Sequence, residues 1–168
     1  MAEYGMHWRW GDTNPITEPI DSATVIRAGD LLWRNGTTKK VEPASAFEKD
    51  TDLATTQEAF AMVFVGVAMQ SSTAGLDNHI RVATTGVFEF KDATSKPSHA
   101  NGDYVGASLN DATMSLEPRK IIAVEKSYQA IGRIAHSAGV PAGKAFVEIR
   151  STIMYGGVAG SDPTHGKG

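Results

Sequence analysis

Short runs of apolar and β-branched residues, separated by Gly, Pro, Asn and Asp, dominate the chain and predict β-strands. Residues 80–84 and 87–90 alternate between apolar and polar side chains, as in strands with one buried face. Residues 62–69 are almost continuously apolar, which favours a strand covered on both faces. The other expected strands are residues 23–27, 31–33, 40–42, 104–105, 120–125, 129–135 and 145–153. Strands this short and this closely spaced are typical of an all-β fold, either a small barrel or a sandwich.

A helical signature occurs only in residues 52–61, where Asp52 or Thr55 is a suitable N-cap for the segment that follows. The remaining segments lack the three-to-four-residue spacing of apolar positions that an amphipathic helix requires. We therefore expect at most one short helix.

Two kinds of turn separate the expected strands. Gly29-Asp30 precedes residues 31–33, and Asn35-Gly36 follows them. An Asn-Gly pair is a strong hairpin signal because both residues tolerate positive φ. Gly102-Asp103 precedes residues 104–105 in the same way. We interpret all three pairs as structural turns rather than as parts of an active site.

The second half of the chain repeats the order of features found in the first half. Each half contains a Gly-Asp turn, a strand, a Glu-Pro pair, a strand with an internal Gly, an Ala-Gly turn and an alternating strand. The matching positions are Asp30 and Asp103, Glu42 and Glu117, Gly66 and Gly132, Gly75 and Gly143, and Val82 and Ile149. This shared order predicts two pseudo-repeats, about residues 23–90 and 97–155, that pack into one core.

The two ends of the chain differ from this single β domain, residues 23–155. Residues 1–22 hold two of the three Trp and lack a sustained periodicity, which predicts an extended N-terminal arm. Residues 156–168 are rich in Gly and predict a flexible tail.

Composition narrows the possible functions. The 168 residues include no Cys, which removes disulfides, thiolate catalysis and cysteine-ligated zinc. Sixteen basic and nineteen acidic residues give a formal charge of −3 without long charged blocks, so we expect no nucleic-acid partner. The longest apolar run, residues 60–69, is too short to span a bilayer, and we expect no membrane partner.

Candidate chemistry is sparse. The His residues show no metal-ligand spacing, and no Gly-x-Ser-x-Gly motif is present. Residues 139–145 resemble a phosphate-binding loop only superficially, because Pro141 lacks an amide donor and Ala145 replaces the hydroxyl that such loops use. We expect no catalytic residue, no metal and no cofactor.

Residues of the types that dominate binding hot spots gather in the arm. Tyr4, His7, Trp8, Arg9 and Trp10 lie within seven residues, outside the repeat. Two interpretations stay open, namely anchors on a partner or a hydrophobic plug against the protein's own barrel. We favour partner contact, because the repeat already supplies a complete core.

Several short sequence segments, taken in order, resemble those of the small head decoration proteins of tailed phages. These proteins are also called capsid cement proteins and are often labelled RecA/RadA-like phage-associated. The segments are Ala28-Gly-Asp30, residues 65–68 with Ala74-Gly75, residues 80–88, residues 102–105, Ile131-Gly132, Ala142-Gly143 and residues 147–149. The resemblance covers about residues 23–153. The long Trp-rich arm and residues 45–57, which look inserted, depart from that family.

The resemblance implies a β-barrel-like module, often a homotrimer, that sits on the outer capsid surface of a virion after synthesis in the host cytoplasm. Such a protein is not an enzyme. It decorates and stabilises the capsid by bridging subunits of the major capsid protein. A carbohydrate- or receptor-binding β module on a virion is the alternative. A β-barrel hydrolase is a third hypothesis, which a cleft with a converging His and carboxylate would favour.

Overall fold

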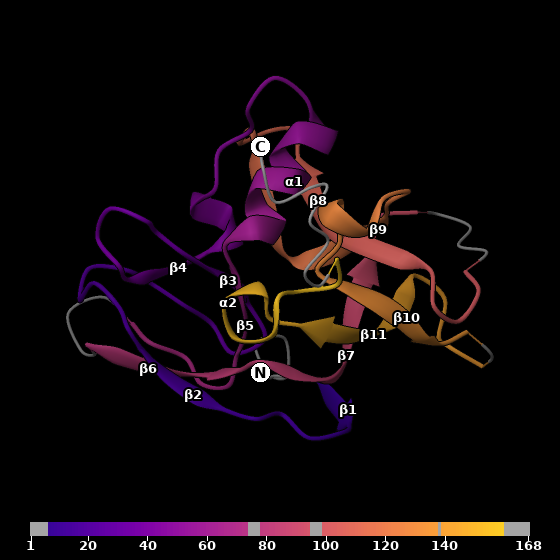
Figure 1. The fold of residues 1–168 in the computed structure, drawn as a ribbon, viewed down its shortest axis with the longest axis horizontal. Helices are drawn as coiled ribbons and strands as arrows, with labels where there is room; N and C mark the ends of the chain where they lie inside the picture. The colour runs from indigo at the N-terminus through magenta and orange to yellow at the C-terminus, as the bar shows by residue number, and fades with distance from the viewer. Residues whose placement is uncertain (1–6, 74–77, 95–98, 138, 160–168) are drawn as a thin grey trace.

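The computed structural model describes residues 7–73, 78–94, 99–137 and 139–159. The strands are β1 (Trp8–Trp10), β2 (Ile16–Pro19), β3 (Leu31–Arg34), β4 (Val41–Pro43), β5 (Phe64–Ala68), β6 (His79–Ala83), β7 (Thr85–Asp92), β8 (Tyr104–Asn110), β9 (Ser115–Ala123), β10 (Gly132–His136) and β11 (Lys144–Arg150). The helices are α1 (Leu53–Met62) and the one-turn α2 (Thr152–Tyr155), and two 3₁₀ turns are η2 (Ala44–Ala46) and η3 (Ser127–Gln129). The all-β prediction is confirmed (Figure 1).

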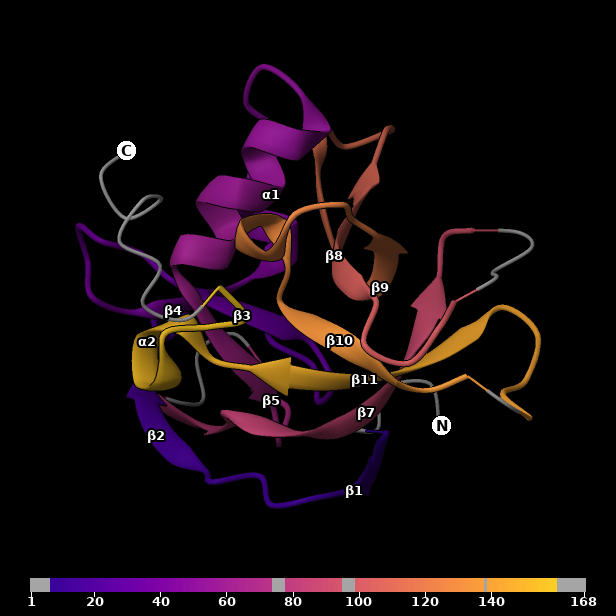
Figure 2. The same ribbon diagram turned by 45° about the vertical axis from the view of Figure 1, so that its right-hand side comes forward.

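The strands form two sheets. In the first, β7, β11, β10, β8 and β9 are hydrogen-bonded in that order, and β9 returns to β7 through a short parallel pairing, which closes a five-stranded ring. The remaining strand of this sheet, β1, pairs with residues 87–88 of β7, whereas β9 pairs with residues 91–92 of the same strand. The second sheet is antiparallel in the order β2, β6, β5, β3, β4. Figure 2 shows α1 at one end of the molecule and β1 and β2 at the opposite end.

The two sheets have the same strand order. Strands β2, β6, β5, β3 and β4 of one sheet correspond to β7, β11, β10, β8 and β9 of the other, and both series follow the same connectivity along the chain. The second unit therefore begins at β7, which the sequence pattern placed at the end of the first unit. Its counterpart in the first unit is β2, which lies within the expected arm.

Gly-Asp turns occupy equivalent corners of the two units. At Gly29-Asp30, the aspartate carboxylate accepts from the backbone N–H of Arg27 at 2.9 Å, and the glycine has φ of 95°. At Gly102-Asp103, the carboxylate accepts from the backbone N–H of Ala100 at 2.8 Å, and the glycine has φ of 92°. Both pairs are therefore turns, as expected from the sequence, and they have matching hydrogen bonds.

The loop after β3 differs from the two-residue hairpin that Asn35-Gly36 predicts. The side chain of Asn35 accepts from the N–H groups two and three residues later, and the residue with positive φ is Lys39, at 60°. Gly36 does not adopt positive φ. The loop after β8 is built in the same way on Asn110, with positive φ at Met114. The asparagine side chain, rather than the glycine, shapes this loop.

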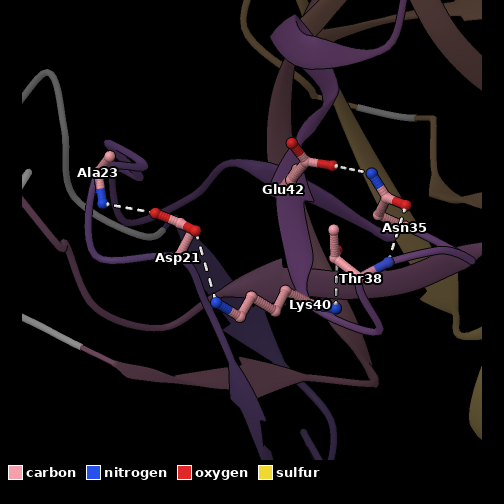
Figure 3. A network of polar contacts seen from close by, with 6 residues as sticks. All are labelled: Asp21, Ala23, Asn35, Thr38, Lys40 and Glu42. Atoms are coloured by element: carbon pink, nitrogen blue, oxygen red, sulfur yellow. Dashed lines mark hydrogen bonds and ion pairs between the residues drawn. The ribbon is translucent and has the colours of Figure 1, made fainter.

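Further polar contacts fix this loop against its surroundings (Figure 3). The Asn35 amide donates to the carboxylate of Glu42 at 2.9 Å, which ties both ends of the hairpin together. Lys40 reaches Asp21 at 3.4 Å, and Asp21 accepts from the backbone N–H of Ala23. The contact between Lys40 and Asp21 connects the residue just before β4 to the segment that follows β2.

Two hydrophobic cores share the central strands of the second sheet. Within β5, Phe64 and Val67 belong to the larger core, which fills the ring and the space under α1, whereas Val65 and Ala68 belong to a smaller core on the opposite face. All five residues of β5 are buried. The apolar run therefore forms a strand covered on both faces, as its pattern predicts.

Helix α1 covers one end of the larger core. Its N-cap is Asp52, whose side chain accepts from the backbone N–H of Thr55 at 2.7 Å. Phe60 on this helix is fully buried and its ring packs edge-on against Phe47 and tilted against Phe64. The predicted helix over residues 52–61 is confirmed, with bounds shifted by one residue.

The described part of the expected arm belongs to the β domain rather than standing apart from it. Residues 8–10 pair with β7, and residues 16–19 pair with β6 along their whole length. An ion pair between Glu18 and Arg34 further connects β2 to β3. Sequence patterns missed these strands because Gly and Pro residues around them favoured an irregular arm. Of the expected tail, residues 160–168 lie outside the described residues.

The internal glycine of β5 is a strict steric requirement. A Cβ at Gly66, which has φ of 154°, would overlap the carbonyl oxygen of Ala83 on β6. We expect Gly66→Ala to lower the free energy of unfolding by about 3 kcal/mol or more, because the two central strands would have to separate. Denaturant unfolding measures this change.

Gly36→Ala is the matched control, because a Cβ there meets nothing within 4 Å and the backbone does not have positive φ. We expect its effect to stay within about 0.5 kcal/mol. Equal destabilisation by the two variants would contradict the close approach of β5 and β6.

Candidate functional site

Strand β1 holds its two tryptophans at the surface. Trp8 lies opposite Phe88 and Trp10 opposite Val87, with an irregular register between them. The side chains remain 48% and 44% exposed although the backbone is paired. Tyr4, which the sequence groups with them, lies outside the described residues. A hydrophobic plug against the protein's own barrel, the alternative to partner contact, is thus not formed by these two rings, because neither enters a core.

Other aromatic and cationic groups surround Trp10. Its ring packs edge-on against Phe146 at 5.9 Å and His136 at 6.5 Å between centroids. The Arg9 guanidinium lies 5.0 Å from the centre of the Phe146 ring and forms an ion pair with Glu89. We call Arg9, Trp10, His136 and Phe146 the aromatic surface, which combines two of the expected β1 residues with two residues of β10 and β11. Trp8 is not part of it, because its register partner Phe88 is on the core side of β7, opposite to Phe146.

The first Gly-Asp turn lies at the junction of the two units. The Asp30 side chain is buried, with 4% of the residue exposed, and its Oδ1 lies 3.4 Å from Nε of Arg119 on β9. No well-aligned hydrogen bond reaches Oδ1 from the described residues. Asp103, at the equivalent corner, is exposed. Only one copy of this turn therefore contributes an ion pair between the units.

Burial raises the pKa of the Asp30 carboxyl above its ordinary value of 3.8, against the opposing effects of the Arg27 N–H and the Arg119 and Arg27 charges. A carboxyl whose pKa is raised on folding binds protons more tightly in the folded protein than in the unfolded chain. Its contribution to stability is therefore most favourable at low pH and declines as pH rises from 3.8 through the folded pKa.

A cleft of about 390 Å³ opens beside this turn, where β1 leaves the edge of β7 and β9 takes its place. Gly29 and Arg119 lie on one side of it, and His7 lies near the end of β1. Most of its other polar lining is charged, from Glu89, Lys91, Glu117, Lys120 and Lys144. The cleft therefore lies between the Gly29-Asp30 turn and a group of charged side chains that the sequence pattern did not identify.

A second cleft is lined by His99, one member of a histidine–carboxylate pair. Its Nε2 contacts Oδ2 of Asp92, whose side chain is fully buried and does not line the cleft. Ser137 and His136 also line this cleft, which measures about 430 Å³. No hydrogen bond joins Ser137 to His99 in the described part of the chain, so a relay from carboxylate to imidazole to hydroxyl is not assembled.

Strand alternation could have identified some of the missed residues. On β7, Glu89 and Lys91 stand two residues apart and so face the same side of the sheet. Their proximity to Lys120 depends on the parallel pairing of β7 with β9, which no local pattern reveals. Local patterns likewise do not reveal the contact of Arg119 with Asp30, because these residues are far apart in the sequence.

The described residues contain no group of three or more His, Asp or Glu side chains placed to hold a metal ion. Within the same residues, no helix has the length and apolar character that crossing a membrane requires. No protein-family model matches the chain, and no curated protein matches its sequence. Function therefore has to be inferred from the geometry of the chain itself.

The burial of Asp30 has a measurable consequence. We expect Asp30→Asn to gain stability relative to the wild type as pH rises from 4 to 7, because the variant removes a carboxylate that is unfavourable when charged. Thermal unfolding of both proteins across this range measures the difference. Asp103→Asn makes the same change in the exposed turn and controls for the turn itself. A stability difference that is constant with pH would contradict the assignment.

Proposed function

We propose that this chain is a non-enzymatic structural protein of a phage virion, which decorates the outer capsid surface and bridges subunits of the major capsid protein. The observation that carries the proposal is the aromatic surface. Trp10 on this surface and Trp8 on the other face of the same strand both remain about half exposed, although the protein's own sheet already holds the strand in place. Large aromatic groups in a rigid frame are the typical anchors of protein interfaces.

The position of the aromatic surface at a sheet edge also favours binding of a partner protein. Strand β1 is at the edge of its sheet, so one side of its backbone is not paired within the described residues. Arg9 and His136 place polar groups beside the rings, which resembles the mixed composition of interfaces. A partner strand or loop could therefore gain apolar contacts and backbone hydrogen bonds together.

The proposed effect on the capsid follows from mass action. A protein that binds the assembled shell and not its separated subunits stabilises the shell in proportion to its occupancy. A standard protein interface buries about 1,600 Å² in total. If the chain acts as a homotrimer, as the sequence resemblance implies, three such contacts would reinforce one another through high effective concentration.

A carbohydrate- or receptor-binding module on a virion is the second candidate. The same exposed Trp10 ring, with His136 beside it and Arg9 over the neighbouring Phe146, offers an apolar face and hydrogen-bonding groups to a sugar. A glycan array with the purified protein separates this function from capsid binding, because decoration requires no glycan.

The deciding experiment mixes the purified chain with virus-like particles that were assembled without it. We expect the wild type to sediment with the particles at a fixed stoichiometry and to raise their disruption temperature. A double variant, Trp8→Ser with Trp10→Ser, should keep the fold and bind at least about thirtyfold more weakly, because losing one hot-spot residue costs about 2 kcal/mol and about 1.4 kcal/mol is tenfold in affinity. Point variants are preferable to deleting residues 2–21, since that deletion would remove two strands.

Tyr155→Ser is the matched control, because Tyr155 is also an exposed aromatic, 39% accessible, but lies on α2. It should bind as the wild type does. A wild-type protein that stays in the supernatant would overturn the proposed function. Equal binding by the double variant would leave decoration in place but exclude the aromatic surface as its anchor.

A further inference from the structure

Three lysines lie side by side on neighbouring strands at the closure of the ring. Lys144 on β11 is the direct register partner of Lys91 on β7, and Lys91 is in turn the partner of Lys120 on β9. Register partners in a sheet point to the same face, and neighbouring strands are about 4.8 Å apart. The three lysine side chains therefore leave the sheet from one row of residues across three strands.

Such a row is unfavourable for folding unless anions compensate it, since like charges placed directly opposite one another destabilise a sheet. The two outer lysines have partners: Lys144 lies 3.9 Å from Glu89, and Lys120 lies 3.9 Å from Glu117. Lys91, in the middle, is exposed and forms no ion pair with an acidic side chain of the described residues. The uncompensated charge is thus concentrated at the centre of the row.

The lysine row lines the cleft beside the Gly29-Asp30 turn. With Arg119, four basic residues and two acidic ones line this space, but Arg119 is paired with Asp30 beside the cleft, which leaves a formal surplus of +1 in a chain whose net charge is −3. The volume of about 390 Å³ is within the range of small-ligand sites. Positive charge is therefore local to the cleft and does not reflect the overall charge of the protein.

We propose that this cleft binds a compact anion that carries two or more negative charges, with Lys91 as its central contact. Three ammonium groups in a row favour multiple charges over a single one. The ligand is compact because Glu89 and Glu117 flank the row, so that an extended polyanion would lie over two carboxylates. The proposal is independent of capsid decoration and uses none of the aromatic surface residues.

Citrate and inorganic phosphate are suitable probes. At constant low ionic strength, we expect each to raise the unfolding temperature of the wild type and to shift amide resonances of β7 and β9 in a saturable manner. Lys91→Gln should weaken both effects about fivefold, the equivalent of one lost charge contact. Without added anion, the same variant should unfold at a higher temperature than the wild type, because it removes the middle charge of the row.

Two further variants separate a site from general charge effects. Lys126→Gln removes an exposed lysine outside the cleft and should change neither response. Lys91→Arg keeps the charge and should keep anion binding. Equal anion responses in wild type, Lys91→Gln and Lys126→Gln would overturn the proposal.

A tetraglutamate peptide tests whether the ligand is compact. We expect it to bind more weakly than citrate, because Glu89 and Glu117 would repel the parts of the peptide that extend beyond the row. Tighter binding of tetraglutamate would overturn the compact ligand and indicate an acidic segment of a partner protein. Neither outcome depends on whether the chain binds a capsid.

Discussion

The burial of β5 on both faces is the constraint on which the rest of the structure depends. Phe64 and Val67 pack into the core shared with the ring and α1, while Val65 and Ala68 pack into the smaller core. Gly66 allows β6 to approach β5 closely, since a Cβ there would overlap the carbonyl oxygen of Ala83. The larger core contains residues of both units, whereas the buried residues of the smaller core all come from the first unit. The two units are thus held as one domain by the larger core, into which β5 packs one face, rather than by a surface interface.

The repeated architecture also explains why charged side chains lie at the junction between the two units. Two units with the same strand order cannot be packed together symmetrically, because one closes into a ring and the other remains open. The Gly-Asp turn of the open unit meets β9 of the closed unit, which buries Asp30 against Arg119, whereas Asp103 stays exposed. The parallel contact that closes the ring brings Lys91 beside Lys120. Asymmetry between similar units thus generates the cleft and its surplus of positive charge.

Local patterns in the sequence were sufficient for the fold class, for α1 with its Asp52 cap, and for β5, since each depends on neighbouring residues. The Gly-Asp turns were also evident. The pairing of β1 and β2 could not be predicted in this way, because Gly and Pro residues interrupt the arm and both strands gain stability only from the sheets they join. The similarity of the loops at Asn35 and Asn110 was missed, although a Thr follows each asparagine at the same distance. The lysine row depends on register between distant strands, which composition and periodicity do not encode.

We infer that the two units form one cooperative domain because residues of both fill the larger core. Native-state amide hydrogen exchange tests it most directly, by comparing the opening free energies of β5 in the first unit and β10 in the second. One cooperative domain predicts the same value for both strands, equal to the free energy of global unfolding. Two clearly different values, with one unit opening while the other stays protected, would contradict the account.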